Sequence, residues 1–150
     1  MRLALAQLNF TVGAFEGNFR RIADAVVRAR AERADLVVFT ELAITGYFPR
    51  DLLNHQRFVD QNLEQLDRVA KLSDENLAIL IGYVDRNPSP QGKSLYNAAA
   101  LCHRGVVAER RFKSLLPTYD VFDEDRYFEP ASEITPMRLK DWRLGVSICE

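Results

Sequence analysis

The first part of the chain alternates between continuous apolar runs and apolar residues at helical spacing. Leu3 to Leu8 form a nearly continuous apolar run, which predicts a buried strand. Behind Gly17-Asn18, apolar residues recur every three or four positions, which predicts a helix with Asn18 as its N-cap. Leu36 to Phe39 predicts a second strand, and the spacing from Val59 to Ala70 predicts a second helix. The order is strand, helix, strand, helix.

Apolar runs later in the chain are separated by turn residues and predict further strands. A polar loop from Asn87 to Gly92 follows the first of them, and Gly105 suits a hairpin turn at His103 to Gly105 because glycine accepts a positive φ. A second turn is expected at Lys140 to Trp142. The predicted strands are Leu77–Ile81, Ala98–Leu101, Val106–Phe112, Met137–Leu139 and Arg143–Ile148.

The segment from Ser114 to Pro130 has neither the helical nor the strand period. It is rich in Tyr, Phe and carboxylates, and an ordered loop of this length in a compact domain is more often functional than idle. Strand and helix alternation followed by hairpins predicts a layered α/β or α+β domain with a mixed sheet. Because a strand is predicted to end at Ile148 with almost nothing behind it, we expect residues 1–150 to form part of a larger domain.

The composition is that of a globular protein and argues against binding to nucleic acid or to a membrane surface. Twenty Lys and Arg balance twenty-one Asp and Glu, and 47% of residues are hydrophobic. Binding of nucleic acid or of a membrane surface needs a basic field, which this balance does not supply. The short apolar run at the N-terminus lacks a signal-peptide cleavage site, and no apolar stretch approaches the length of a membrane span. We therefore expect a cytoplasmic protein whose two cysteines, Cys102 and Cys149, are thiols.

Three reactive side chains follow predicted strands, namely Glu41, Lys113 and Cys149. Residues at strand ends can converge on a ligand although they lie far apart in sequence. Together they permit amide cleavage through a thioester, with a thiolate nucleophile, a carboxylate base and an ammonium at the oxyanion. Taken singly, each has a structural explanation: Cys149 as a small buried side chain, Glu41 as a cap of backbone amides, and Lys113 as the end of a solvated strand face.

Other chemistries find little support in the sequence. Asp123-Glu-Asp125 resembles the start of a calcium loop, but the sixth position is Phe128 where a sharp turn requires glycine. Neither the cysteines nor the histidines have zinc-binding spacing, and no glycine-rich phosphate loop occurs. We therefore expect no metal and no cofactor in this segment.

Three segments in order resemble the nitrilase, or carbon-nitrogen hydrolase, superfamily. They are Thr40-Glu-Leu-Ala-Ile-Thr-Gly-Tyr-Phe-Pro-Arg-Asp-Leu-Leu53, Arg111-Phe-Lys-Ser-Leu-Leu-Pro-Thr-Tyr-Asp-Val-Phe-Asp-Glu-Asp-Arg-Tyr-Phe128 and Gly145-Val-Ser-Ile-Cys-Glu150. The first is most similar to the glutaminase domains of glutamine-dependent NAD⁺ synthetases. The resemblance implies a nitrilase-like α-β-β-α sandwich with a mixed sheet, of which residues 1–150 are the N-terminal part.

The resemblance also implies roles for the three strand-end residues. Glu41 is expected to be the general base, Lys113 to stabilise the tetrahedral intermediate, and Cys149 to attack the side-chain amide of L-glutamine. Glu124 matches a second glutamate near the lysine, and Tyr119 and Tyr47 match aromatic positions near the glutamine pocket or the ammonia exit. For the tyrosines, aromatic packing is an equally good explanation.

In the family, ammonia passes to a separate synthetase domain, which uses ATP and Mg²⁺ to amidate nicotinic acid adenine dinucleotide. The resemblance thus implies that domain as a partner and suggests a homo-oligomer. Two alternatives stay open from the residues. The chain could be a stand-alone amidase acting on another small amide, or a truncated, non-catalytic interaction module whose exposed sheet pairs with another chain.

Overall fold

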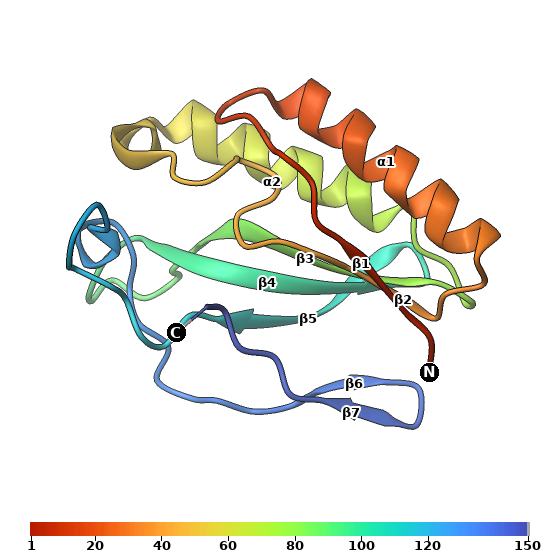
Figure 1. Cartoon of the computed structure of the whole chain (residues 1–150). Helices are drawn as coiled ribbons and strands as arrows, with labels where there is room; N and C mark the ends of the chain where they lie inside the picture. Colours follow the sequence, from red (N-terminus) through yellow and green to blue (C-terminus); the bar gives the residue numbers. More distant parts are fainter. Residues whose placement is uncertain (150) are drawn as a thin grey trace.

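A computed structural model of the chain describes residues 1–149 and shows a five-stranded sheet with helices on one face (Figure 1). The strands lie in sequence order; β1, β2 and β3 run parallel, and β4 and β5 continue antiparallel. This confirms the predicted mixed sheet. The elements are β1 (Leu3–Ala6), α1 (Phe15–Ala31), β2 (Leu36–Phe39), η1 (Arg50–Asn54), α2 (Gln56–Ala70), β3 (Ala78–Arg86), β4 (Leu95–His103), β5 (Val106–Phe112), η2 (Glu124–Arg126), β6 (Met137–Leu139) and β7 (Trp142–Leu144).

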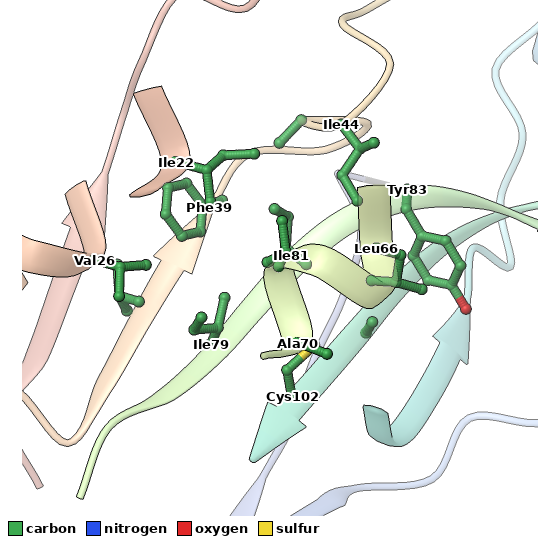
Figure 2. Close-up of a cluster of buried hydrophobic side chains, with 14 of the residues drawn as sticks. Ile22, Val26, Phe39, Ile44, Leu66, Ala70, Ile79, Ile81, Tyr83 and Cys102 are labelled. Carbon is green, nitrogen blue, oxygen red and sulfur yellow. The ribbon is translucent and has the colours of Figure 1, made fainter. Parts of the chain in front are cut away.

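The main core lies between the sheet and helices α1 and α2, which cover one face side by side (Figure 1). Ile22 and Val26 of α1 meet Ile79 and Ile81 of β3, and Leu66 of α2 packs into the same cluster (Figure 2). Each of these side chains is almost fully buried, and burial of one aliphatic side chain contributes about 1.5–3 kcal/mol to folding. The helical spacing seen in the sequence is therefore the spacing of this buried face.

The opposite face of the sheet is partly covered by the β6–β7 hairpin, which lies below it in Figure 1. Met137 and Leu139 of β6 pack on Leu36, Ala78 and Leu101 in the sheet. Side chains alternate between the two faces along a strand, so the residues next to these belong to the helix-covered side. This alternation decides which face each polar residue of β4 occupies.

The helix start was predicted wrongly. Helix α1 begins at Phe15, preceded by Ala14, and Asn18 lies inside its first turns without capping it. Asn18 is fully buried: its Nδ2 donates to the carbonyl oxygens of Thr11 and Ile44, and its Oδ1 accepts from the Thr11 amide. In the sequence, this asparagine has the residue type and position of a helix cap. In the structure, its hydrogen bonds connect the segments of Thr11 and Ile44 to the helix.

The second hairpin is shorter than predicted. Its turn is Lys140-Asp141, Trp142 belongs to β7, and β7 ends at Leu144, so the strand predicted to reach Ile148 is wrong beyond that residue. Leu144 pairs with Met137, and the preceding residue, Pro136, has no amide hydrogen to extend the ladder. The chain therefore approaches Cys149 as an irregular segment.

The first hairpin has the expected turn, its second strand β5 has the predicted bounds, and its first strand β4 is longer than predicted. Arg104 and Gly105 both have positive φ, 56° and 79°, which confirms the predicted glycine conformation. β3 continues to Arg86 and β4 begins at Leu95, so polar residues next to the apolar runs belong to the strands as well. One of them is Asn97, a fully buried residue near the start of β4.

Candidate active site

The candidate site forms where several segments meet at one end of the sheet. Glu41 stands in the turn after β2, and Lys113 directly follows β5. Since β5 runs antiparallel to β4, its end lies beside the beginning of β4, and the Lys113 amide donates to the Asn97 carbonyl oxygen over 2.8 Å. The parallel strand β2 ends at the same side of the sheet. Topology thus brings together residues 72 positions apart.

A buried ammonium between two carboxylates is the centre of the site. Nζ of Lys113 lies 2.9 Å from Oε1 of Glu41 and 3.0 Å from Glu124. Lys113 is 2% exposed and Glu124 is 0% exposed. Charges removed from water to this degree are tolerated only when they are paired and hydrogen-bonded. Lys113 therefore does not end a solvated strand face.

The two carboxylates keep Lys113 charged. Burial by itself favours the neutral amine, but the hydrogen bonds from Nζ to Glu41 and Glu124 outweigh it and raise the pKa of Lys113 above its ordinary value. Within residues 1–149, Nζ donates to Oε1 of Glu41 and to Oε1 of Glu124, and Oε2 of Glu124 also lies 3.0 Å away. An ammonium has three N–H groups, so one hydrogen bond to each carboxylate leaves the third N–H for a bound molecule.

Glu124 is held by donors from three segments. Its Oε1 accepts from the Tyr47 hydroxyl at 2.9 Å and from Lys113, and its Oε2 lies 3.3 Å from Nδ2 of Asn97. Burial of the hydroxyl and its bond to Glu124 raise the pKa of Tyr47, so the phenol stays protonated. Phe128, fully buried in a neighbouring cluster, anchors the loop that carries Glu124. Part of the aperiodic segment from Ser114 to Pro130 is thus built into the site.

Cys149 lines a pocket of about 120 Å³ together with Glu41, Gly82 and Ala99. It is exposed, and its φ is 53°, in the left-handed region that few non-glycine residues adopt. Outliers of this kind gather at functional sites. Cys149 therefore shares a pocket with Glu41, although no strand leads to it.

The tyrosines predicted near the pocket differ in their surroundings. Tyr47 bonds directly to Glu124, whereas Tyr119 is 57% exposed and contacts the Phe122 ring edge-on at 5.7 Å between centroids. Phe122 in turn lies 6.4 Å from the Tyr47 ring. Another pocket, about 490 Å³, lies between η1, α2 and the start of β4, and none of the predicted site residues lines it. We regard the smaller pocket as the site because Glu41 of the charged cluster and Cys149 both line it.

Sequence reasoning missed Asn97. Its Nδ2 lies 2.6 Å from Oε1 of Glu41 and 3.3 Å from Oε2 of Glu124, and the residue is fully buried. The signal was present, since a polar residue directly before Ala98-Ala-Ala-Leu101 interrupts an otherwise apolar strand. A buried polar residue in such a strand needs partners, and here they are the two carboxylates.

The family model for carbon-nitrogen hydrolases matches residues 2–150. The chain belongs to the carbon-nitrogen hydrolase family. It is 44% identical, over 99% of its length, to a glutamine-dependent NAD(+) synthetase of Synechocystis sp., and 37% identical, over its whole length, to one of Thermotoga maritima. It covers 27% and 25% of those relatives, so the chain spans about a quarter of their length.

Solved structures agree with this family assignment. The glutamine-dependent NAD+ synthetase of Acinetobacter baumannii superposes with a TM-score of 0.87 at 28% identity, and the match covers 97% of this chain and 27% of that one. The fold is therefore the N-terminal part of a nitrilase-like domain. This confirms the predicted fold class.

The described part of this carbon-nitrogen hydrolase contains neither a metal-binding cluster nor a membrane-spanning helix. In residues 1–149, no three His, Cys, Asp or Glu side chains are grouped so that they could hold a metal ion. The helices described there are too short or too polar to span a bilayer.

Gly82 supplies a prediction for this carbon-nitrogen hydrolase. A Cβ at Gly82 would lie 2.4 Å from the Leu42 amide nitrogen and 2.6 Å from the Thr40 carbonyl oxygen. Gly82→Ala must therefore displace the backbone that carries Glu41. We expect the free energy of unfolding, measured in urea, to fall by roughly 1–3 kcal/mol. The rate of ammonia release should fall as well.

The matched control is Gly17→Ala. Gly17 lies in α1, where an added Cβ meets only ordinary contacts at 3.9 Å and beyond. Alanine there should stabilise the helix by up to about 1 kcal/mol and leave activity unchanged. Equal activity of Gly82→Ala and the wild-type protein would show that the backbone of Thr40 to Leu42 can shift without harm.

Proposed function

We propose that this chain is the glutamine-hydrolysing part of a glutamine-dependent NAD⁺ synthetase and supplies ammonia to its synthetase part. The observation that carries the proposal is the 44% identity to such a synthetase over 99% of this chain. The chain spans about a quarter of that relative, so the synthetase part is proposed to lie outside residues 1–150, in the same cytoplasmic protein.

The proposed first step forms a thioester. Glu41 takes the proton of the Cys149 thiol as Sγ bonds to the side-chain amide carbon of glutamine. The third N–H of Lys113 donates to the oxyanion of the tetrahedral intermediate. Glu41 then returns its proton to the amide nitrogen as the carbon–nitrogen bond breaks, and ammonia leaves. Support comes from the pocket that Glu41 and Cys149 both line.

The second step regenerates the thiol. Glu41 accepts a proton from water as the water oxygen bonds to the thioester carbon, and the proton returns to Sγ as the carbon–sulfur bond breaks. Glutamate is released. Glu124 and Tyr47 do not exchange protons in this proposal. They hold Lys113 between two carboxylates so that its charge stays fixed throughout.

The ammonia is proposed to reach a synthetase domain that amidates nicotinic acid adenine dinucleotide. ATP and Mg²⁺ would bind that domain, and no step by residues of this chain uses them. Tyr119, at the exposed rim beside Phe122, is proposed to contact glutamine or the ammonia exit. A homo-oligomer is part of the same proposal.

The test is ammonia release from L-glutamine by the natural-length protein. When ATP and nicotinic acid adenine dinucleotide are added, hydrolysis is followed as glutamate, because the synthetase part then consumes the ammonia. Glutamate formation should rise on this addition, and a rate that does not change with these substrates would favour a stand-alone amidase. No release from glutamine, with release from another small amide, would contradict glutamine as the substrate. No release from any amide would favour the non-catalytic interaction module.

Thiol labelling provides a second prediction. An electrophilic analogue of glutamine should label Cys149 irreversibly and leave Cys102 untouched. Cys102 is fully buried, and burial raises the pKa of its thiol to about 12, so almost no thiolate forms. Mass spectrometry of peptides locates the label, and excess glutamine should slow it. Equal, slow labelling of both thiols would argue for the non-catalytic interaction module.

A further inference from the structure

Asn97 differs from the other fully buried asparagines of residues 1–149. Asn18 and Asn62 each use both ends of the amide on backbone groups, with Nδ2 donating and Oδ1 accepting. Asn97 uses only Nδ2, and both of its acceptors are carboxylates. Its Oδ1 is buried with no hydrogen-bond partner. A buried acceptor without a partner is costly, so the orientation of this amide needs a reason.

The reason lies in the charges around the amide. Exchanging the positions of Oδ1 and Nδ2 by rotating the Asn97 amide would place Oδ1 against Glu41 and Glu124. Carboxylates cannot donate a hydrogen bond to it. With Nδ2 toward the two acids, each receives one N–H donor. The orphaned Oδ1 is therefore the consequence of an amide that serves two carboxylates at once. The backbone of Asn97 is equally fixed, because its carbonyl accepts from the Lys113 amide at 2.8 Å.

The contact also distinguishes the two oxygens of Glu41. Nδ2 of Asn97 and Nζ of Lys113 both bind Oε1, at 2.6 and 2.9 Å. Within residues 1–149, Oε2 of Glu41 has no hydrogen-bond partner. A carboxylate fixed through one oxygen presents the other in a defined direction, as proton transfer requires.

We propose that Asn97 is a positioning residue that fixes Oε1 of Glu41 and leaves Oε2 free to take the proton of the nucleophile. The proposal rests on the function proposed above. Asn97 itself exchanges no proton and touches no substrate. Its two N–H groups bind Glu41 and Glu124 in one geometry, so the base and the second carboxylate are oriented together.

The test is the pH profile of ammonia release by the natural-length protein carrying Asn97→Leu, which has a similar shape but no donor. We expect kcat to fall about 10- to 100-fold with little change in KM, as expected for one lost charge-assisted hydrogen bond. The acidic limb of kcat/KM should move to higher pH, because the ionised base has lost a donor. The titratable groups around Glu41 are Lys113, Glu124, Tyr47 and Cys149, and the variant keeps all of them.

Asn97→Asp separates charge from shape. Aspartate is nearly isosteric with asparagine, so a role in packing alone would make it the milder change. Our proposal expects the reverse, since a third carboxylate would face Glu41 and Glu124. Asn97→Ser keeps one donor, so its acidic limb should lie between those of the wild type and Asn97→Leu. If Asn97→Leu or Asn97→Asp does not fold, the pH profile of Asn97→Ser still tests the proposal.

The matched control is Asn62→Leu. Asn62 is equally buried, but it joins α2 to the Val84 backbone, away from the charged cluster. It should lower stability without moving the acidic limb. Acidic limbs that coincide with that of the wild type in the Asn97 variants would overturn the inference, and so would Asn97→Asp being more active than Asn97→Leu. A wild-type protein that releases no ammonia would instead refute the proposed function, and the inference with it.

Discussion

Replacing Cys149 with alanine in the natural-length protein is expected to abolish NAD⁺ formation from glutamine and to leave NAD⁺ formation from added ammonia intact. Without Sγ no thioester can form, and loss of a nucleophile typically lowers the rate by roughly 1,000-fold or more. The side chain is exposed at the pocket, so its removal should not disturb the core. Initial rates of NAD⁺ formation, measured once with glutamine and once with added ammonia, show which of the two activities is lost.

Cys102→Ala is the matched control for this experiment. Its thiol is buried among the helix-facing side chains of β4, so the variant should lose some stability but use glutamine normally. Glutamine-dependent synthesis that survives in Cys149→Ala would contradict the assignment of the nucleophile. Loss of synthesis from both nitrogen sources would mean that the substitution damages the synthetase part as well.

The second large effect is expected for Lys113→Met. The change leaves Glu41 and Glu124 with no positive charge between them, and breaking a buried ion pair on one side typically costs about 3–5 kcal/mol. The proposed donor to the oxyanion is lost too, and loss of such a donor typically lowers kcat by roughly 10²- to 10³-fold. Urea unfolding and ammonia release measure the two effects separately.

A double variant tests the cause of the lost stability. Lys113→Met with Glu124→Gln removes one of the two unpaired charges, so it should recover part of the stability and none of the activity. Lys93→Met is the control, because the Lys93 pair with Asp125 lies at the surface, where ion pairs contribute about 0–1 kcal/mol. If Lys113→Met were no less stable than Lys93→Met, the buried pair would contribute nothing to folding.

The pH dependence of this contribution has a definite sign. The pKa of Lys113 is raised above its ordinary value of 10.5 in the folded protein. Its ionisation therefore stabilises the fold fully below pH 10.5, and this contribution is lost as the pH rises through the folded value. Between neutral pH and about pH 10, the difference in stability between wild type and Lys113→Met should not change on account of this group.

The sheet was predictable because its strands are continuous apolar runs and its helices bury one regular stripe. Local patterns failed where a distant contact decides the outcome. Asn18 has the chemistry of a helix cap, yet a loop 26 residues away supplies its buried partner Ile44. The last strand stops at Leu144 because its partner strand begins at Met137, directly after Pro136, and the apolar run of the last strand does not contain this information about pairing.

The site was predictable as a set of residue types at strand ends, but its geometry was not. Lys113 ends a row that alternates like an exposed strand face, and only the sheet register shows that it points among buried carboxylates. Three similar motifs in order made the functional reading of Glu41 and Cys149 the better hypothesis. Asn97 belongs to none of those motifs, so only its burial beside Glu41 and Glu124 revealed it.

The order of the site residues along the chain has a consequence for biosynthesis. Glu41, Asn97, Lys113 and Glu124, the members of the buried charge cluster, all precede Cys149. A ribosome adds residues from the N-terminus, so every group of that cluster has been made before the proposed nucleophile is added. The antiparallel β3, β4 and β5 that frame the cluster are consecutive, so their pairing needs no segment translated later. The thiol of Cys149 is thus the last of these five groups to be synthesised.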